Sequence, residues 1–212
     1  FSIERSDAVT AVSAYLRDET YRAFGCVSCD LRVIPNFVNL QEYYPADGRP
    51  SLAPEGHRVI THVSNFREVK RVKDVVRVCA RIRRAMPATL VMIGDGPERV
   101  DAENEARDLG VGGDVRFLGR LDTIASLLQA SDLFLLPSQT ESFGLAALEA
   151  MACGSPVVAT RAGGLPEVVV AVLGIAITVV SIIVELASSR YTGRIADLFI
   201  KDPVNLMVLG FF

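Results

Sequence analysis

The sequence predicts an α/β fold in which a parallel β-sheet is covered by helices on both faces. Strand-like segments rich in Val, Ile and Leu alternate with helical segments over most of the 212 residues, which is the pattern of such a sheet. Two strand-like segments are followed by proline, at Pro35 and Pro137, and proline does not continue a central strand. We see no internal repeat or low-complexity tract.

The elements follow in order along the chain. A short strand over residues 7–12 precedes a helix over residues 14–24, which Ser13 can cap and Gly25 can stop. The other predicted strands cover residues 31–34, 59–63, 89–93, 115–118, 132–138 and 156–160. The other predicted helices cover residues 69–86, 98–109, 122–129 and 146–151. The longest of them is predicted from apolar residues at three- and four-residue spacing, namely Val69, Val72, Val76, Cys79 and Ile82.

A segment rich in proline and glycine separates the first elements from the rest. Between residues 35 and 56 the chain holds Pro35, Pro45, Pro50, Pro54, Gly48 and Gly56. This composition indicates a long irregular connection. We interpret it as an interdomain linker.

The C-terminal part departs from the alternation. Residues 168–184 carry no charge and are rich in Val and Ile. This length lies at the lower margin for a membrane span, and the β-branched bias suits a buried strand or core helix equally. Residues 206–212 are also apolar, so we expect the tail to be covered or to mediate self-association.

Composition and charge restrict the function. The formal charge of −3, from 22 basic and 25 acidic residues, gives no electrostatic reason to expect a nucleic-acid partner. The first residues do not form a secretory signal, and four scattered cysteines suit the reduced thiols of a cytoplasmic protein. Cys26 and Cys29 form a lone C-x-x-C pair, which without a second pair is weak support for zinc or redox chemistry.

Residues 141–149 carry the most functional information. Glu141 is expected in a strand-to-helix loop and Glu149 on the helix that follows. The amides of Phe143, Gly144 and Leu145 then lie at a helix N-terminus, where unpaired N–H groups and the helix dipole favour an anion such as phosphate. Two carboxylates would flank that anion.

Two further strand-to-helix junctions have polar or glycine-rich sequences. Gly94 and Gly96 follow a strand where doubly wound folds bind nucleotides, but the dinucleotide fingerprint needs a third glycine where this chain has Arg99. The other junction holds the basic residues Arg67, Lys70, Arg71 and Lys73, which could neutralise a diphosphate. A solvated helix face is the alternative interpretation. His62 fits a histidine at a strand end better than a catalytic base, and no metal-ligand cluster or cofactor motif is present.

These motifs, in this order, resemble the C-terminal domain of retaining glycosyltransferases of family 4, which have the GT-B fold. The resemblance is carried by the E-x7-E pair Glu141 and Glu149, and by the segments at residues 94–98, 117–119 and 163–167, with a hinge-like segment at residues 34–38. It implies a Rossmann-like domain that binds a nucleotide sugar, with most of the N-terminal domain missing. Residues 1–40 would be its remnant and the hinge, residues 41–169 the donor-binding domain, and residues 170–212 a divergent apolar tail.

The resemblance also implies roles for individual residues. Glu141 would bind hydroxyls of the donor sugar, Glu149 those of the ribose, and Lys70 with Arg67 the diphosphate. Uracil would lie near Gly94 and Leu118, chiefly on backbone contacts. Neither a metal ion nor another cofactor is implied, because cations and helix amides would stabilise the negative charge on the leaving group.

Residues 61–72, together with the hinge, are similar to the members that transfer N-acetylglucosamine from UDP-N-acetylglucosamine to L-malate with retention, in bacillithiol biosynthesis. Many relatives carry Gly-Arg where this chain has Ser64-Asn65, so the arginine that contacts the diphosphate is assigned to Arg67. Two alternatives remain. One is a UDP-sugar epimerase of GT-B fold, and the other is a non-catalytic, truncated chain that binds nucleotide sugars or associates with membranes.

Overall fold

The computed structural model describes residues 6–25, 30–46 and 51–172. The chain forms two compact units, Phe1–Val168 and Val169–Phe212, and every named helix and strand belongs to the first. That unit contains both the predicted N-terminal remnant and nearly all of the predicted donor domain, so the boundary between residues 40 and 41 stays a prediction.

A five-stranded parallel sheet forms the larger part of the first unit. Its order is β5-β4-β3-β6-β7, and every neighbouring pair is parallel. The strands are β3 (Arg58–Val63), β4 (Ala88–Ile93), β5 (Val115–Gly119), β6 (Leu133–Leu136) and β7 (Val157–Ala159). The chain builds outward from β3 to β5 and then returns to the other side of β3 with β6, so the strand order reverses between these two neighbours.

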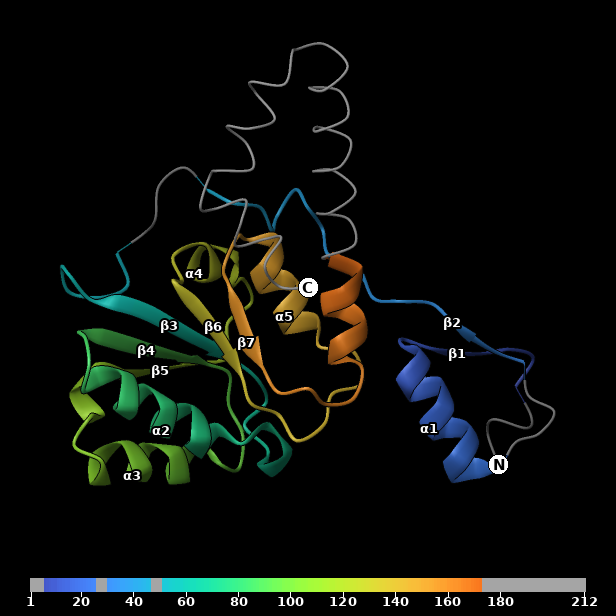
Figure 1. Cartoon of the computed structure of the whole chain (residues 1–212), viewed down its shortest axis with the longest axis horizontal. Helices are drawn as coiled ribbons and strands as arrows, with labels where there is room; N and C mark the ends of the chain where they lie inside the picture. The colour runs from blue at the N-terminus through green and yellow to red at the C-terminus, as the bar shows by residue number, and fades with distance from the viewer. Residues whose placement is uncertain (1–5, 26–29, 47–50, 173–212) are drawn as a thin grey trace, which may run out of the picture. The chain divides into compact units, whose positions relative to one another are not determined.

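Helices cover both faces of this sheet, as the sequence predicts (Figure 1). One face packs against α2 (Val72–Arg83) and α3 (Arg99–Asp108), and the other against α4 (Ala125–Gln129) and α5 (Leu145–Ala152). β4 is buried along its whole length, because apolar residues must face both layers of a central parallel strand. The Rossmann-like α/β class is confirmed.

A second, two-stranded parallel sheet lies near the N-terminus of the chain. It pairs β1 (Val9–Ala11) with β2 (Leu31–Val33), and α1 (Ala14–Phe24) connects them. Ser13 caps α1 by accepting from the Leu16 amide, and Gly25 ends it at φ +59°. Both caps are confirmed, but each of these strands has only three residues and is shorter than expected.

The predicted helix over residues 69–86 is wrong at its start. Residues Glu68–Lys70 form a short 3₁₀ turn, η2, and Arg71 then adopts a left-handed conformation at φ +51° before α2 begins at Val72. Periodicity cannot reveal this break, because Val69 and Val72 keep a helical spacing across it. Its consequence is that Lys70 lies in a turn and not on a helix face.

The remaining boundaries differ by a few residues. The predicted strand over residues 132–138 is reduced to Leu133–Leu136 and the predicted helix over residues 122–129 to Ala125–Gln129. A further 3₁₀ turn, η3, covers Gly112–Asp114. Residues 34–46 and 51–57 contain neither helix nor strand, which confirms an irregular connection there.

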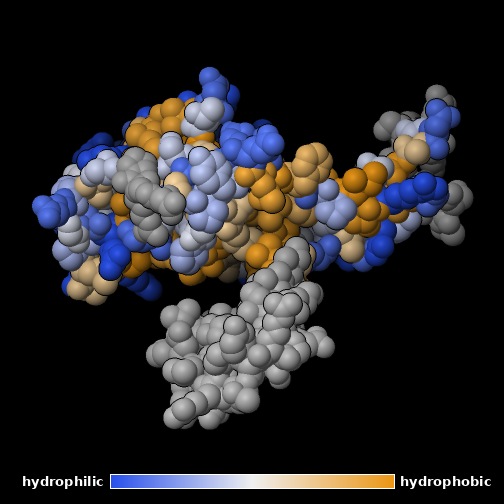
Figure 2. Space-filling view, turned by 90° about the horizontal axis from the view of Figure 1, so that it is seen from above, coloured by the Kyte–Doolittle hydropathy of each residue, from blue (hydrophilic) through white to orange (hydrophobic). Residues whose placement is uncertain are grey.

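Large apolar side chains remain at the surface of this connection. Phe37 is 86% exposed, and Ile34 and Leu40 are exposed as well. Hydrophobic patches also interrupt the polar surface in Figure 2. Exposed apolar groups gathered in one segment are typical of a surface that contacts another protein part, which is compatible with an interdomain linker. The assignment as an interdomain linker stays a prediction.

Several predictions fall outside the described residues. These are the C-x-x-C pair Cys26 and Cys29, most of the apolar segment 168–184, and residues 206–212. None of the helices in the described ranges has the length and hydropathy needed to cross a membrane. Self-association through the tail stays a prediction.

Candidate donor-binding site

The predicted site residues lie at or just beyond the carboxyl ends of the parallel strands. Lys70 follows β3 and Glu141 follows β6, and these strands are neighbours in the sheet. The strand order reverses between them, and in doubly wound sheets the loops that leave neighbouring strands at such a reversal diverge. Ligands of doubly wound sheets bind at such a switch point.

Lys70 and Glu141 form an ion pair at this position. The Lys70 Nζ lies 2.5 Å from the Glu141 Oε1, with side-chain exposures of 20% and 10%. The Ser138 hydroxyl donates to the same Oε1 at 2.8 Å. Both contacts use Oε1 and neither uses Oε2. Removing one partner of such a shielded pair lowers the stability of the fold, because the other partner is left as an uncompensated charge.

The backbone that carries Lys70 is strained at both ends. Among the described residues, Phe66 and Arg71 are the non-glycine residues with positive φ, at +39° and +51°. The segment between them is held across the sheet edge, because the Gln139 amide donates to the Val69 carbonyl at 2.8 Å. Strained backbone that surrounding contacts hold in place is characteristic of functional sites.

His62 supports this segment from within the sheet. It is fully buried in β3, its Nδ1 is 2.8 Å from the Leu135 carbonyl, and its Nε2 is 2.8 Å from the Ser64 hydroxyl. Burial lowers the pKa of His62 to about 4, so the ring is neutral at pH 7. A neutral ring donates from Nδ1 and accepts from Ser64. This geometry favours a His62 that stabilises the end of β3 over a His62 that acts as a catalytic base.

Ser64 has a structural function in the turn after β3. Its hydroxyl also accepts from the Phe66 amide at 3.3 Å, which stabilises the turn after β3. A Cβ on Gly94 would lie 1.8 Å from the Ser64 carbonyl oxygen, and one on Gly96 would lie 2.1 Å from the Asn65 oxygen. Both glycines are therefore required by the close packing of two loops.

The structure places the predicted uracil-binding residues beside these loops. The Gly94 amide donates to the Gly119 carbonyl at 2.7 Å, next to Leu118 at the end of β5. Leu118 is 39% exposed, so an apolar side chain is available at this end of the sheet. Contact of these residues with a base stays a prediction.

The N-terminus of α5 lies where the sequence places it. Gly144 is its N-cap at φ +94°, between the buried Phe143 and the partly exposed Leu145. The loop before it packs on the turn at Gly163 and Gly164, because the Gly164 amide donates to the Glu141 carbonyl at 2.8 Å. A Cβ on Gly163 would lie 2.0 Å from that same carbonyl oxygen. The two glycines therefore support the Glu141 loop directly.

Glu149 has a partner that sequence reasoning missed. The carboxylate is half-buried on α5 and is hydrogen-bonded by Tyr43 of the irregular connection. Burial, with the nearby Glu149 charge, raises the pKa of Tyr43 to about 12. The signal available in the sequence was an aromatic hydroxyl in the irregular connection, but nothing local shows that Tyr43 contacts a helix more than 100 residues later.

The carboxylate of Glu149 is destabilised in its charged form. Burial raises its pKa and the charge of Glu42 adds to this, while the Tyr43 hydrogen bond opposes it. A raised folded-state pKa means that the folded chain loses stability as pH rises through that pKa.

We expect Glu149→Gln to unfold at a higher temperature than the wild type at pH 7, with the difference vanishing below pH about 4. Thermal unfolding from pH 4 to 8 measures this, with Glu103→Gln as the control.

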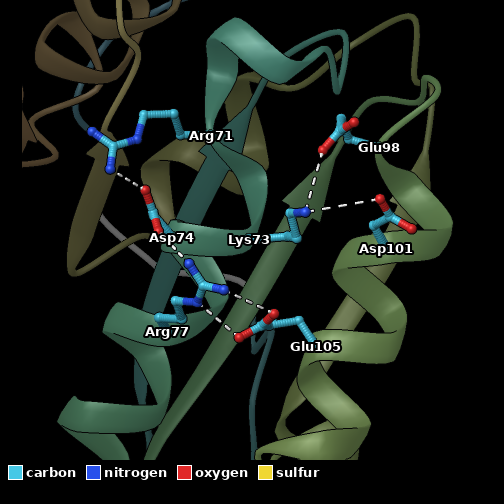
Figure 3. A network of polar contacts seen from close by, with 7 residues as sticks. All are labelled: Arg71, Lys73, Asp74, Arg77, Glu98, Asp101 and Glu105. Atoms are coloured by element: carbon cyan, nitrogen blue, oxygen red, sulfur yellow. Dashed lines mark hydrogen bonds and ion pairs between the residues drawn. The ribbon is translucent and has the colours of Figure 1, made fainter.

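The basic residues of the junction separate into two groups. Arg67 is exposed at the N-cap of η2, and within the described ranges its guanidinium forms no ion pair. Arg71 pairs with Asp74 at 2.5 Å, and Lys73 lies 4.0 Å from Glu98. These two belong to a network between α2 and α3 (Figure 3).

Part of that network lines a pocket of about 230 Å³, whose walls are Glu68, Arg71, Val72, Lys73, Asp74, Arg77, Glu98 and Gln139. Arg77 links Asp74 to Glu105, and Lys73 also approaches Asp101 at 3.9 Å (Figure 3). Each cation in the network has an acidic partner, so the network supplies little net positive charge for an anion. Of the junction cations, Lys70 contacts Glu141 directly, and Arg67 has no ion pair with any residue that the structure describes. No group of three or more potential metal ligands occurs in the part of the chain that the structure describes.

Comparisons with known proteins show the family of this chain. Residues 45–180 match the family model described as glycosyl transferases group 1. The chain therefore belongs to this family of glycosyltransferases, and its structural neighbours have the GT-B fold.

Within the family, the chain is 43% identical over 173 residues to N-acetyl-alpha-D-glucosaminyl L-malate synthase of Bacillus anthracis, covering 80% of this chain and 45% of that protein. It is 33% identical to D-inositol 3-phosphate glycosyltransferase of Rhodococcus opacus, covering 77% and 40%. The Anabaena HepE structure with UDP and glucose superposes with a TM-score of 0.69 at 27% identity, covering 76% and 46%. The chain thus spans less than half the length of these relatives.

Proposed function

We propose that this chain is the donor-binding part of a retaining glycosyltransferase that transfers N-acetylglucosamine from UDP-N-acetylglucosamine to L-malate, in bacillithiol biosynthesis. The observation that carries the proposal is the shielded pair of Lys70 and Glu141 at the switch point, beside the N-terminus of α5. The similarity to the malate synthase supports the choice of substrates. The similarity to the D-inositol 3-phosphate glycosyltransferase makes D-inositol 3-phosphate the competing acceptor.

In this scheme, the protein binds a diphosphate with cations and amides. Lys70 and the exposed Arg67 approach the phosphates, and the first amides of α5 face them with the positive end of the helix dipole. These groups stabilise the charge that grows on UDP as the glycosidic bond breaks. The scheme requires no metal ion or other cofactor.

The two carboxylates anchor hydroxyls. Glu141 accepts from the donor sugar through Oε2, the oxygen that neither Lys70 nor Ser138 contacts. Glu149 accepts from the ribose, in the orientation that Tyr43 holds. A carboxylate can accept from two adjacent hydroxyls, which suits both tasks.

Calorimetric titration of this chain with UDP and UDP-N-acetylglucosamine, in buffer containing a chelator, tests donor binding. We expect both ligands to bind the wild-type chain. We expect Glu149→Ala to bind each about tenfold more weakly, because one charge-assisted hydrogen bond is worth about 1.5 kcal/mol or more. Glu103→Ala, on the surface of α3, is the control and should bind as the wild type does. A wild-type chain that does not bind UDP would refute the proposal.

Acceptor choice needs the full-length gene product that carries this sequence. We expect UDP release from UDP-N-acetylglucosamine when L-malate is added, and none with D-inositol 3-phosphate. Release with the inositol phosphate alone would reject the malate assignment but retain donor binding. Inversion of UDP-N-acetylglucosamine at the sugar without an acceptor would favour the epimerase alternative.

A further inference from the structure

The first turn of α1 is capped by a carboxylate from the far end of the same unit. Glu167 lies in a helical segment over residues 165–172, and both of its oxygens are used. Oε2 accepts from the Ala14 amide at 2.9 Å and Oε1 from the Tyr15 amide at 2.7 Å. α1 has no acidic residue in its own first turn, so Glu167 supplies the negative charge that a helix N-terminus favours.

The same end of α1 also contacts the loop that carries Glu141. The Ser13 hydroxyl donates to the Ser142 carbonyl at 2.5 Å while it accepts from the Leu16 amide. The Tyr15 hydroxyl lies 3.4 Å from the Thr140 hydroxyl. The Glu141 loop and the helical segment that carries Glu167 therefore both hold the N-terminus of α1.

The Glu141 loop is joined to the turn that precedes the Glu167 segment. The turn at Gly163 and Gly164, just before Glu167, packs on the backbone of Glu141 and Ser142 so closely that a Cβ on Gly164 would lie 2.4 Å from the Ser142 carbonyl oxygen. The amide of Gly164 donates to the Glu141 carbonyl. A shift of the Glu141 loop therefore changes the positions of both acceptors that hold α1, because there is no space between the loops to absorb it.

We propose that Glu167 is a positioning residue that couples the donor site to α1. When a nucleoside diphosphate occupies the Lys70 and Glu141 site and holds the Glu141 loop, the contacts of Glu167 and Ser13 with α1 become stronger. By linkage, α1 held in this position strengthens donor binding to the same degree. This inference rests on the proposed donor function for the identity of the ligand.

Amide hydrogen exchange of Ala14 and Tyr15, measured by NMR on the labelled full chain, tests the contacts without ligand. In Glu167→Ala both amides should exchange about fivefold faster or more, because both lose a charged acceptor at a helix end. Glu167→Gln keeps one acceptor oxygen and should keep protection at one of the two amides. Glu103→Ala should change neither. Unchanged exchange in Glu167→Ala would overturn the proposal.

Saturating UDP tests the coupling. In the wild type, UDP should slow exchange of both amides by about fivefold, the lower end of usual coupling between two sites. In Glu167→Ala this slowing should disappear although UDP still binds. UDP binding without slower exchange in the wild type would overturn the coupling alone. Absence of UDP binding would refute the proposed donor function, and the coupling with it.

Discussion

Replacement of Lys70 by alanine is expected to weaken UDP binding by about 30-fold or more. Lys70 is a largely shielded cation 2.5 Å from Glu141, and truncation of one partner in such a pair usually costs about 2–5 kcal/mol of binding free energy. Two effects act in the same direction. The phosphates lose their cation, and the Glu141 carboxylate remains beside them without a counter-charge. Calorimetric titration with UDP measures the change.

The matched control for this variant is Lys73→Ala. It removes the same charge three positions later, but the Lys73 ammonium lies near Glu98 and Asp101 and not at the switch point. We expect its UDP affinity to remain within about twofold of the wild type, because exposed ion pairs of this kind contribute little. Equal losses in the two variants would mean that general positive charge, and not the Lys70 position, holds the diphosphate.

Replacement of Gly94 by alanine is expected to lower the free energy of unfolding by about 3 kcal/mol or more. Gly94 has a φ of +123° and its missing Cβ would lie 1.8 Å from the Ser64 carbonyl oxygen. Alanine both adopts this backbone conformation poorly and displaces the loop after β3, and these two costs add. Chemical denaturation measures the loss.

Gly110→Ala separates the two causes. Gly110 also has a positive φ, at +71°, but nothing lies within 4 Å of a Cβ placed there. It should therefore lose only the cost of a left-handed alanine, about 1–2 kcal/mol. If Gly94→Ala lost no more than Gly110→Ala, the close approach of the two loops would not be the reason for glycine at position 94.

Local signals in the sequence were sufficient to predict the fold class and the strand ends beside which the candidate site residues lie. Alternating strand and helix patterns predicted the parallel sheet, and Ser13 and Gly25 marked the ends of α1. The segment around Gly144 predicted a helix N-terminus after a buried strand. Each of these depends on residues within a few positions of one another, and hydrogen bonds in turns and helices are equally local.

The break in the chain at Arg71 shows where local signals end. Apolar spacing predicts one helix from Val69, yet Lys70 lies in a 3₁₀ turn that the Gln139 amide holds through the Val69 carbonyl. That contact joins the segment after β3 to the segment after β6, so it exists only once the two strands are neighbours. The hydrogen bond between Gln139 and Val69 thus holds the 3₁₀ turn at Lys70, where the local helix propensity of the sequence favours an α-helix.

The sequence by itself determined which residue types the candidate site contains, and which strand ends they follow. Only the tertiary structure decided their partners: Lys70 with Glu141, Tyr43 with Glu149, and Glu167 with the amides of α1. The first pair is separated by 71 positions and the last contacts by 152 and 153. Strand order decides which distant loops meet, and that order results from burying both faces of the sheet. No short window of residues contains that information.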